Sequence, residues 1–471
     1  MQRSFLGLFN WIIVVLLQGK ELISLNNNDT CKNMRKNTRV KELNKFALPL
    51  IVQSIAGQIL VLGDHALIGR ISVEAYSVTG IISNILYTIA GVAGCITLVL
   101  NIRAGKAMGE NNEQLYKDEF STSLLLSLYL GVIFAVLLNI SSNMVLTDLW
   151  GYSGAMFDIG LDYIRIMSPY LLLQLLLFAF ATKLKVLQKT KWIMIGSTIS
   201  NVVDLLVDYV LIFGKFGFPQ MGVNAVSIST IFSMCLNLGI YIWVCRKEIG
   251  VKLQRIGIYH HLMIKQIKQS IPFMGQELLD GSIFAFVIST MVARIGVIET
   301  AGYTISKQLL NLIEMPMYMY ASATLTLVSM SYGAKNRTEI SEYTKLAIRL
   351  SYFFVIVVAS IFIIFKEQLP RIITDDMAAQ NYASSVFVYI VVAYSCNGLS
   401  TILRNALQAL SESKFVLYST AIVNTIVMVL LLLIVELLGL QLIGVLACLF
   451  LNYAIISIIY WVKFDRKMKS F

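Results

Sequence analysis

The amino-acid sequence predicts an all-α integral membrane protein with twelve transmembrane helices arranged as two six-helix lobes. The mean hydropathy of its 471 residues is +0.74. Only 14% of the residues are charged, against about 25% in soluble domains. Twelve apolar segments are long enough to cross a bilayer, and the second six segments repeat the first six. Most of the chain is therefore expected to lie in lipid.

The twelve segments alternate between loops of different charge. In chain order they are 45–70, 76–101, 120–146, 155–182, 192–214, 222–244, 270–293, 300–331, 345–365, 383–409, 415–437 and 442–462. Lysine and arginine concentrate in every second loop, for example at 103–117, 183–191 and 246–268. The positive-inside rule then places these loops and both termini in the cytoplasm. We expect a multi-pass protein of the plasma (cell) membrane. The same rule explains the net charge of +11, so we expect no nucleic-acid partner.

The predicted domain organisation follows these loops. It comprises a cytoplasmic leader (1–44), an N-lobe with spans 1 to 6 (45–244), a cytoplasmic linker (245–269), a C-lobe with spans 7 to 12 (270–463) and a cytoplasmic tail (464–471). The leader contains FLGLFNWIIVVLLQG, which is short for a span and is followed by a basic stretch. It is interpreted as a segment that touches the membrane, or as an overlong start.

Several classes of function lack their sequence signals. The six cysteines have no CxxC spacing, and the three histidines form no HExxH pattern. No GxxxxGK[ST] loop is present to bind ATP phosphates. A membrane hydrolase would need a polar catalytic cluster, and a receptor would need a sizeable soluble domain. We therefore expect neither an enzyme nor a cofactor.

The two halves of the chain resemble each other at several places. RISVEAYSVTG (70–80) matches RIGVIETAGYT (294–304), and AMGENNEQ (107–114) matches SYGAKNRTE (331–339). VLQKTKWIMIGSTISN (186–201) matches ALQALSESKFVLYSTAIVN (406–424) in the same way. Because six spans is an even number, both copies share one orientation in the membrane. Parallel repeats of this kind place a central cavity between two lobes.

Carboxylates occur inside an apolar segment of the first half but not in its copy. The segment NVVDLLVDYVLIFG (201–214) contains Asp204 and Asp208. Aligning the two halves places Val427 and Leu431 at the equivalent positions. A carboxylate near the bilayer centre costs at least roughly 2.5 kcal/mol on insertion scales. Since the second half builds the same helix with aliphatic residues, the fold does not require these acids.

The spacing of these residues indicates a cation site. Asn201, Asp204 and Asp208 lie at i, i+3 and i+7, on one face of a helix. Asp64 in the first segment falls opposite Ile288 in the repeat. Carboxylates buried together repel and lose water, so they favour taking up a proton or sharing Na⁺ through oxygen ligands. The alternative is a structural cluster held by hydrogen bonds or by a neighbouring lysine.

Polar residues in the second half permit two interpretations. Glu277 and Asp280 are i, i+3 near the start of the seventh segment. Their expected partners are each other, Lys307 or Glu314 in the next segment. A functional and a structural role are equally compatible with this pattern.

Four segments in order resemble the multidrug and toxic-compound extrusion (MATE) family of the MOP flippase superfamily. They are ALPLIVQSIAGQILVLGDHALIGRIS, NVVDLLVDYVLIFG, GVNAVSIST and MPMYMYASATLTLVSMSYGAKN, and the resemblance covers residues 43 to 465. The resemblance implies a cation-coupling site in the N-lobe. Its residues would be Asp64, Asn201, Asp204, Asp208 and Thr230, with Asp204 standing where the family usually has asparagine.

In the C-lobe the resemblance is less complete. Asp280 lies at the family's acidic position in helix 7, but Asn397 stands at the acidic position of helix 10. Glu277, Asp280, Glu314 and Asn397 are therefore candidates for a substrate or proton site. If the coupling ion is Na⁺, its expected ligands are Asp64, Asp204 and Asp208.

The resemblance implies a monomeric antiporter that exports organic compounds, cationic or amphipathic, by alternating access. H⁺ or Na⁺ would be the coupling ion, and the partners would be small organic substrates and membrane lipids. The alternative is a lipid-linked glycan or lipid flippase of the same superfamily. A flippase would need a strongly cationic cavity for pyrophosphate, whereas lysine and arginine mostly avoid the apolar segments.

Overall fold

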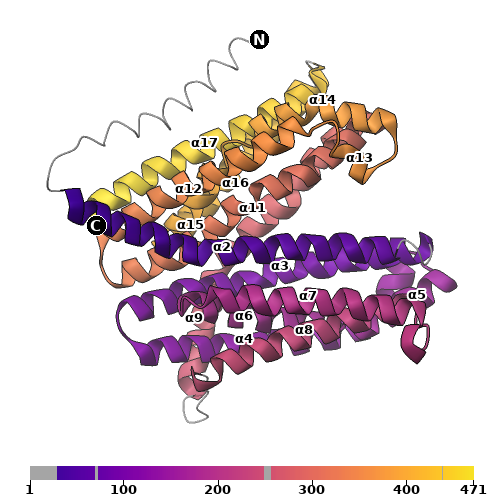
Figure 1. The fold of residues 1–471 in the computed structure, drawn as a ribbon, viewed down its shortest axis with the longest axis horizontal. Coiled ribbons are helices and arrows are strands. Elements are labelled where there is room, and N and C mark those ends of the chain that lie inside the picture. Colours follow the sequence, from indigo (N-terminus) through magenta and orange to yellow (C-terminus); the bar gives the residue numbers. More distant parts are fainter. Residues whose placement is uncertain (1–28, 69–72, 249–255, 438) are drawn as a thin grey trace. The chain divides into compact units, whose positions relative to one another are not determined.

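The computed structural model describes residues 29–68, 73–248, 256–437 and 439–471 (Figure 1). These residues form helices and turns, with no β-strand among them. The chain divides into two compact units, residues 1–44 and 45–471, and the lobes belong to the second unit. The apolar stretch of the predicted leader, residues 5–19, lies outside the described residues.

The first half forms six long helical segments among the described residues. They are α2 (Asp29–Ile68), α3 (Val73–Gly109), α4 (Glu113–Met144) continued by the π-helical η2 (Val145–Leu149), α5 (Ala155–Met167) with α6 (Tyr170–Val186), α7 (Thr190–Phe213) and α8 (Val223–Cys245). Single turns of 3₁₀-helix follow α7 and α8, at η3 (Lys215–Gly217) and η4 (Arg246–Glu248).

The second half repeats this plan with six further segments. They are α9 (Ile256–Glu277) with the π-helical η6 (Leu278–Phe284) and α10 (Ala285–Ile295), α11 (Val297–Gly333), α12 (Arg337–Ile364), α14 (Met377–Ala393) with α15 (Asn397–Ala409), α16 (Ser413–Leu432) with η7 (Leu433–Leu437), and α17 (Gln441–Ser470). The short α13 (Pro370–Ile373) precedes α14. Each predicted apolar segment falls on one of these twelve helical segments.

Ten of the described helical segments are long and apolar enough to cross a membrane. Two of the twelve, α2 and the 37-residue α11, are not among them, although each matches a predicted span, and the reason is clear for α11. It carries Lys307 and Glu314 and many buried serines and threonines. The reason is its position, because α3, α12, α14 and α15 pack around it. A helix surrounded by protein does not need an apolar side chain at every position.

Matching turns confirm the internal repeat. α3 and α11 both end in a turn with a left-handed residue, Asn111 at φ 56° and Lys335 at φ 55°. The next residue in each copy caps the following helix: the side chains of Asn112 and Asn336 accept hydrogen bonds of 3.0 and 3.2 Å from the backbone N–H three residues on. Such caps satisfy N–H groups that have no partner within the helix. The two lobes are thus built from equivalent helix–turn–helix units.

α3 and α11 cross in close contact through small residues. A Cβ atom on Gly109 would lie 1.9 Å from the carbonyl oxygen of Met330. A Cβ atom on Gly333 would lie 2.2 Å from the carbonyl oxygen of Lys106. Gly109 and Gly333 are equivalent in the two repeats, so the crossing is nearly symmetric. Small residues let the backbones of membrane helices approach in this way.

This crossing predicts a difference between two glycine-to-alanine variants of α3. Gly109→Ala forces the α3 and α11 backbones apart and is expected to lower the free energy of unfolding by about 2 kcal/mol or more. Gly80→Ala adds the same methyl group where nothing lies within 4 Å, so it is expected to be neutral or to stabilise the helix by up to ~1 kcal/mol. The thermal midpoint of both variants in detergent tests this expectation. Equal midpoints would contradict the close crossing.

Candidate functional site

The buried face of α7 is a polar stripe. It carries Ser197, Ser200, Asp204 and Asp208, while the opposite face exposes apolar residues such as Leu206. This pattern is the reverse of a soluble amphipathic helix, whose buried face is apolar. A membrane helix can point its polar residues inward because the lipid favours the apolar face. The stripe faces α8, which packs against α7.

Asp204 and Asp208 form the centre of this stripe. Only 2% of Asp204 and none of Asp208 is exposed. Asp208 Oδ1 accepts a hydrogen bond from the hydroxyl of Ser229 on α8. Ser229 and Ser233 also lie beside the carboxyl group of Asp204, and the two acids are close enough to repel each other. Asp204 Oδ1 is buried without a hydrogen-bond partner among the described residues.

Two other predicted N-lobe residues, Asn201 and Thr230, differ in their hydrogen bonds. Asn201 is half-buried, and its Nδ2 has no hydrogen-bond partner among the described residues. Thr230 donates its hydroxyl to the carbonyl oxygen of Val226 at 2.8 Å, within its own helix. The neighbouring Ser229 is the residue that contacts Asp208. Ser229 is not among the residues predicted from the sequence, although its spacing of four residues from Ser233 places both on one helix face.

The side chain of Asp64 lies outside the described residues. The backbone of α2 does approach α7 just before it, because a Cβ atom on Gly63 would lie 2.6 Å from Leu205 Cδ2. Among the described side chains, no three His, Cys, Asp or Glu residues are close enough to hold a metal ion. The N-lobe site offers carboxylate and hydroxyl oxygens, and Asp204 Oδ1 has no hydrogen-bond partner among the described residues. This donor set fits a proton or Na⁺, which prefers oxygen ligands.

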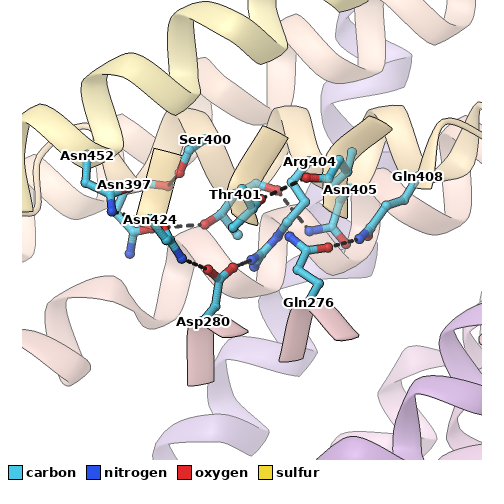
Figure 2. Close-up of polar contacts among 12 residues, drawn as sticks. Gln276, Asp280, Asn397, Ser400, Thr401, Arg404, Asn405, Gln408, Asn424 and Asn452 are labelled. Atoms are coloured by element: carbon cyan, nitrogen blue, oxygen red, sulfur yellow. Dashed lines mark hydrogen bonds and ion pairs between the residues drawn. The ribbon is translucent and has the colours of Figure 1, made fainter. Parts of the chain in front are cut away.

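The C-lobe contains a separate polar cavity of about 270 Å³. Asp280, Arg404 and Asn424 line this cavity, and Figure 2 shows Asp280 between the other two side chains. Asp280 Oδ2 lies 3.2 Å from Arg404 Nη1, and Asp280 Oδ1 accepts a 2.7 Å hydrogen bond from Asn424 Nδ2. Asn424 Oδ1 in turn accepts a 2.9 Å hydrogen bond from Asn452 Nδ2. Asp280 stands in the π-helical η6, a feature frequently found at functional sites.

The partner expected for Asp280 is wrong. Glu277, Lys307 and Glu314 are the partners expected from the sequence, but the structure pairs Asp280 with Arg404 of α15. Arg404 is half-buried in a membrane-spanning segment, where a cation requires an internal partner. This requirement is a signal in the sequence that could have predicted an acidic partner for Arg404. Glu277 lines the same cavity and is exposed.

Glu314 and Asn397 come together in a second group. Asn397 Nδ2 donates a 2.8 Å hydrogen bond to Glu314 Oε1. Lys307 Nζ lies 3.5 Å from Glu314 Oε2 and 3.7 Å from the ring centre of Tyr394. Glu314 is only 3% exposed. The cation of Lys307 and the amide of Asn397 compensate the charge of this buried carboxylate. Lys307, Glu314 and Asn397 thus form one group of polar contacts.

A protein-family model described as MatE matches residues 49–210 and 276–434, which is more than half of the chain. The chain belongs to the MATE family. It is therefore a multi-pass membrane protein of a transporter family. The first match contains Asp204 and Asp208, and the second contains Asp280 and Arg404. Ser229 lies outside both matched ranges.

Two relatives of this MATE protein cover most of its length. "Probable multidrug resistance protein NorM" of Thermotoga maritima is 25% identical over 340 residues, which are 71% of this chain and 72% of that protein. "Probable multidrug resistance protein YoeA" of Bacillus subtilis is 22% identical over 389 residues, which are 81% of this chain and 83% of that protein.

Solved structures share the fold of this MATE protein. One, described as the "outward-facing conformation of a multidrug resistance MATE family transporter of the MOP superfamily", has a TM-score of 0.82 and 16% identity, and covers 92% of this chain and 96% of that chain. A second is a MOP superfamily transporter from Pyrococcus furiosus described as having a binding pocket of reverse polarity. Its TM-score is 0.81 at 16% identity, with coverage of 92% of this chain and 96% of that chain. These likenesses confirm the predicted twelve-helix, two-lobe fold.

Proposed function

We propose that this MATE protein is an antiporter that exports organic compounds, cationic or amphipathic, in exchange for H⁺ or Na⁺. The observation that carries the proposal is the buried pair Asp204 and Asp208, which contacts hydroxyl groups of α8. The equivalent residues in the C-lobe, Val427 and Leu431, are buried and aliphatic. Two buried acids that the fold does not require are expected to serve the transport cycle.

The proposed cycle couples the cation to the orientation of the lobes. A proton neutralises one acid of the pair, or Na⁺ binds among Asp204, Asp208 and Ser229, with Asp64 as the expected third acid. Occupation of the N-lobe site displaces the substrate and favours the inward-open state. A cation shifts this equilibrium only through its different affinity for the two states. The coupling ion therefore has to bind the inward-open state more tightly than the outward-open state.

Three observations support organic compounds as the exported class. The two relatives described above are named as probable multidrug resistance proteins. The C-lobe cavity is lined by the exposed acid Glu277 and by Tyr318, Tyr453 and Tyr460. Aromatic rings and carboxylates both attract organic cations. The cation among the cavity's described lining residues, Arg404, is paired with Asp280, which disfavours the flippase alternative with its pyrophosphate ligand.

The proposal includes the placement predicted from sequence. The protein would act as a monomer in the cell membrane, with both termini and the 245–269 linker in the cytoplasm. The supporting observation is the concentration of lysine and arginine in alternate loops. No cofactor other than the coupling ion takes part.

Efflux from proteoliposomes tests this proposal. Ethidium, a fluorescent organic cation, is loaded into vesicles, and its release is followed under an imposed pH gradient or an imposed Na⁺ gradient. One of the two gradients is expected to drive release without ATP, and its collapse by an ionophore is expected to stop it. A requirement for ATP, or release that neither gradient changes, would refute the antiporter.

A further inference from the structure

The carboxylate of Asp280 has partners for both of its oxygen atoms. Arg404 lies at 3.2 Å from one oxygen and Asn424 at 2.7 Å from the other. About a third of each side chain of the ion pair is exposed, 31% for Asp280 and 29% for Arg404, where they border the cavity. Figure 2 shows how Arg404 reaches across from α15 to the acid on η6. Among the described residues, Arg404 is the cation that contacts this acid, so the positive charge beside Asp280 comes from the protein.

The repeat shows that Arg404 is not required by the fold. α6 and α15 end in equivalent turns, with left-handed residues Gln188 at φ 55° and Ser411 at φ 67°. Ser411 stands 223 positions after Gln188, so Arg404 corresponds to Ala181 in α6. The N-lobe builds the same helix without a charge at this place.

The position of Asp280 is likewise uncharged in the N-lobe. The equivalent turns at Asn111 and Lys335 lie 224 positions apart, which places Asp280 opposite Ala56 in α2. The extra residue that a π-helix accommodates moves this assignment by one position at most, and residues 55–57 are Ile-Ala-Gly. The acid and the arginine are therefore present together in the C-lobe and absent together from the N-lobe.

The two lobes balance their acids by different means. In the N-lobe, hydroxyl groups surround Asp204 and Asp208, and Asp204 Oδ1 has no hydrogen-bond partner among the described residues. In the C-lobe, a guanidinium group neutralises Asp280. A guanidinium stays protonated in proteins, so its charge does not depend on pH. Because it is tethered close to the acid, it also competes with free cations at a high effective concentration.

We propose that Arg404 is a built-in counter-ion of Asp280, so that this acid of the C-lobe cavity takes up no coupling cation, while the exposed Glu277 on the same cavity has no part in the pair. Arg404 then lowers the cation stoichiometry of the transporter by one, since Asp280 is not left to bind H⁺ or Na⁺. This inference rests on the proposed antiport for its role in transport. The pairing itself is tested on the purified protein without any transport.

The test counts bound cations in detergent-solubilised full-length protein. Proton uptake is measured by titration between two buffered pH values, and Na⁺ binding by the shift in thermal midpoint with added NaCl. Arg404→Gln is expected to gain about one cation-binding group relative to the parent, because Asp280 then needs a proton or Na⁺. Arg404→Lys and the double variant Asp280→Asn/Arg404→Gln are expected to return to the parent count. An unchanged count in Arg404→Gln would overturn the proposal.

A second variant keeps the proposal testable if Arg404→Gln fails to fold. Asp280→Asn is expected to bind the same number of cations as the parent, since Asp280 takes up none. Loss of one bound cation in this variant would overturn the proposal. Asp208→Asn in the same assay distinguishes the counter-ion proposal from the antiport proposal. If the parent binds no cation and Asp208→Asn changes nothing, the antiport proposal fails, while the response of the Arg404 variants still decides the counter-ion.

Discussion

Asp208→Asn is expected to abolish gradient-driven efflux while the protein still folds. Asparagine has nearly the shape of aspartate and keeps an oxygen for the hydroxyl of Ser229, but it cannot hold a proton or neutralise Na⁺. To move a two-state equilibrium from 1:99 to 99:1, a ligand must prefer one state by about 10⁴-fold. Without the charge of Asp208 most of that preference is lost, so the initial rate of ethidium release is expected to fall by roughly 100-fold or more.

The matched control for this variant is Asp158→Asn in α5, which removes an exposed acid of the same lobe. It is expected to export ethidium at the parent rate. Both variants are compared for yield, thermal midpoint and release from proteoliposomes under the same gradient. Folding of Asp208→Asn is expected because the C-lobe has the aliphatic Leu431 at the equivalent position. Normal efflux by Asp208→Asn would remove the N-lobe pair from the coupling mechanism.

The sequence predicted the number and place of the helical segments but not their internal irregularities. Hydropathy averages over about 20 residues, so it detects a span and ignores a single inserted residue. The break between α5 and α6 falls at Ser168 and Pro169, where proline interrupts the backbone hydrogen bonds. The π-helical η6 has no proline, and the sequence gives no comparable sign of it.

The candidate site was predictable where it depended on one helix. The spacing of Asp204 and Asp208 placed both acids on one face, and the structure buries that face. Contacts between helices were harder to predict, because one residue along a helix turns the side chain by about 100°. Packing against α7 directs Ser229 at Asp208 and leaves Thr230 bonded to its own backbone. The pairing of Asp280 with Arg404 spans 124 residues, beyond any helical periodicity.

Glu119→Ala is expected to cause the largest loss of stability among the variants considered. Glu119 on α4 is 1% exposed, and its carboxylate accepts hydrogen bonds from Arg103 of α3 and, at 2.9 Å, from Gln266 Nε2 of α9. It thus joins two helices of the first half to the first helix of the second half. Removing it leaves the largely buried Arg103 without its anion. Breaking a buried ion pair in this way costs about 3–5 kcal/mol.

The matched control is Glu113→Ala, six residues earlier on α4. Glu113 also pairs with a cation, Lys117 at 3.0 Å, but 77% of its side chain is exposed. An exposed i, i+4 pair contributes about 0.3–0.5 kcal/mol, so this variant is expected to unfold almost like the parent. Thermal and denaturant unfolding in detergent measure both. Equal losses would mean that burial does not set the contribution of the Glu119 pair.

Glu119→Gln separates the charge of this contact from its hydrogen bonds. Glutamine keeps one acceptor for Arg103 but no charge, and the 3.0 Å hydrogen bond from Gln266 to the backbone oxygen of residue 119 is independent of the side chain. Its stability is therefore expected between those of the parent and Glu119→Ala. Stability equal to the alanine variant would assign the contribution to charge. Stability equal to the parent would assign the contribution to hydrogen bonding.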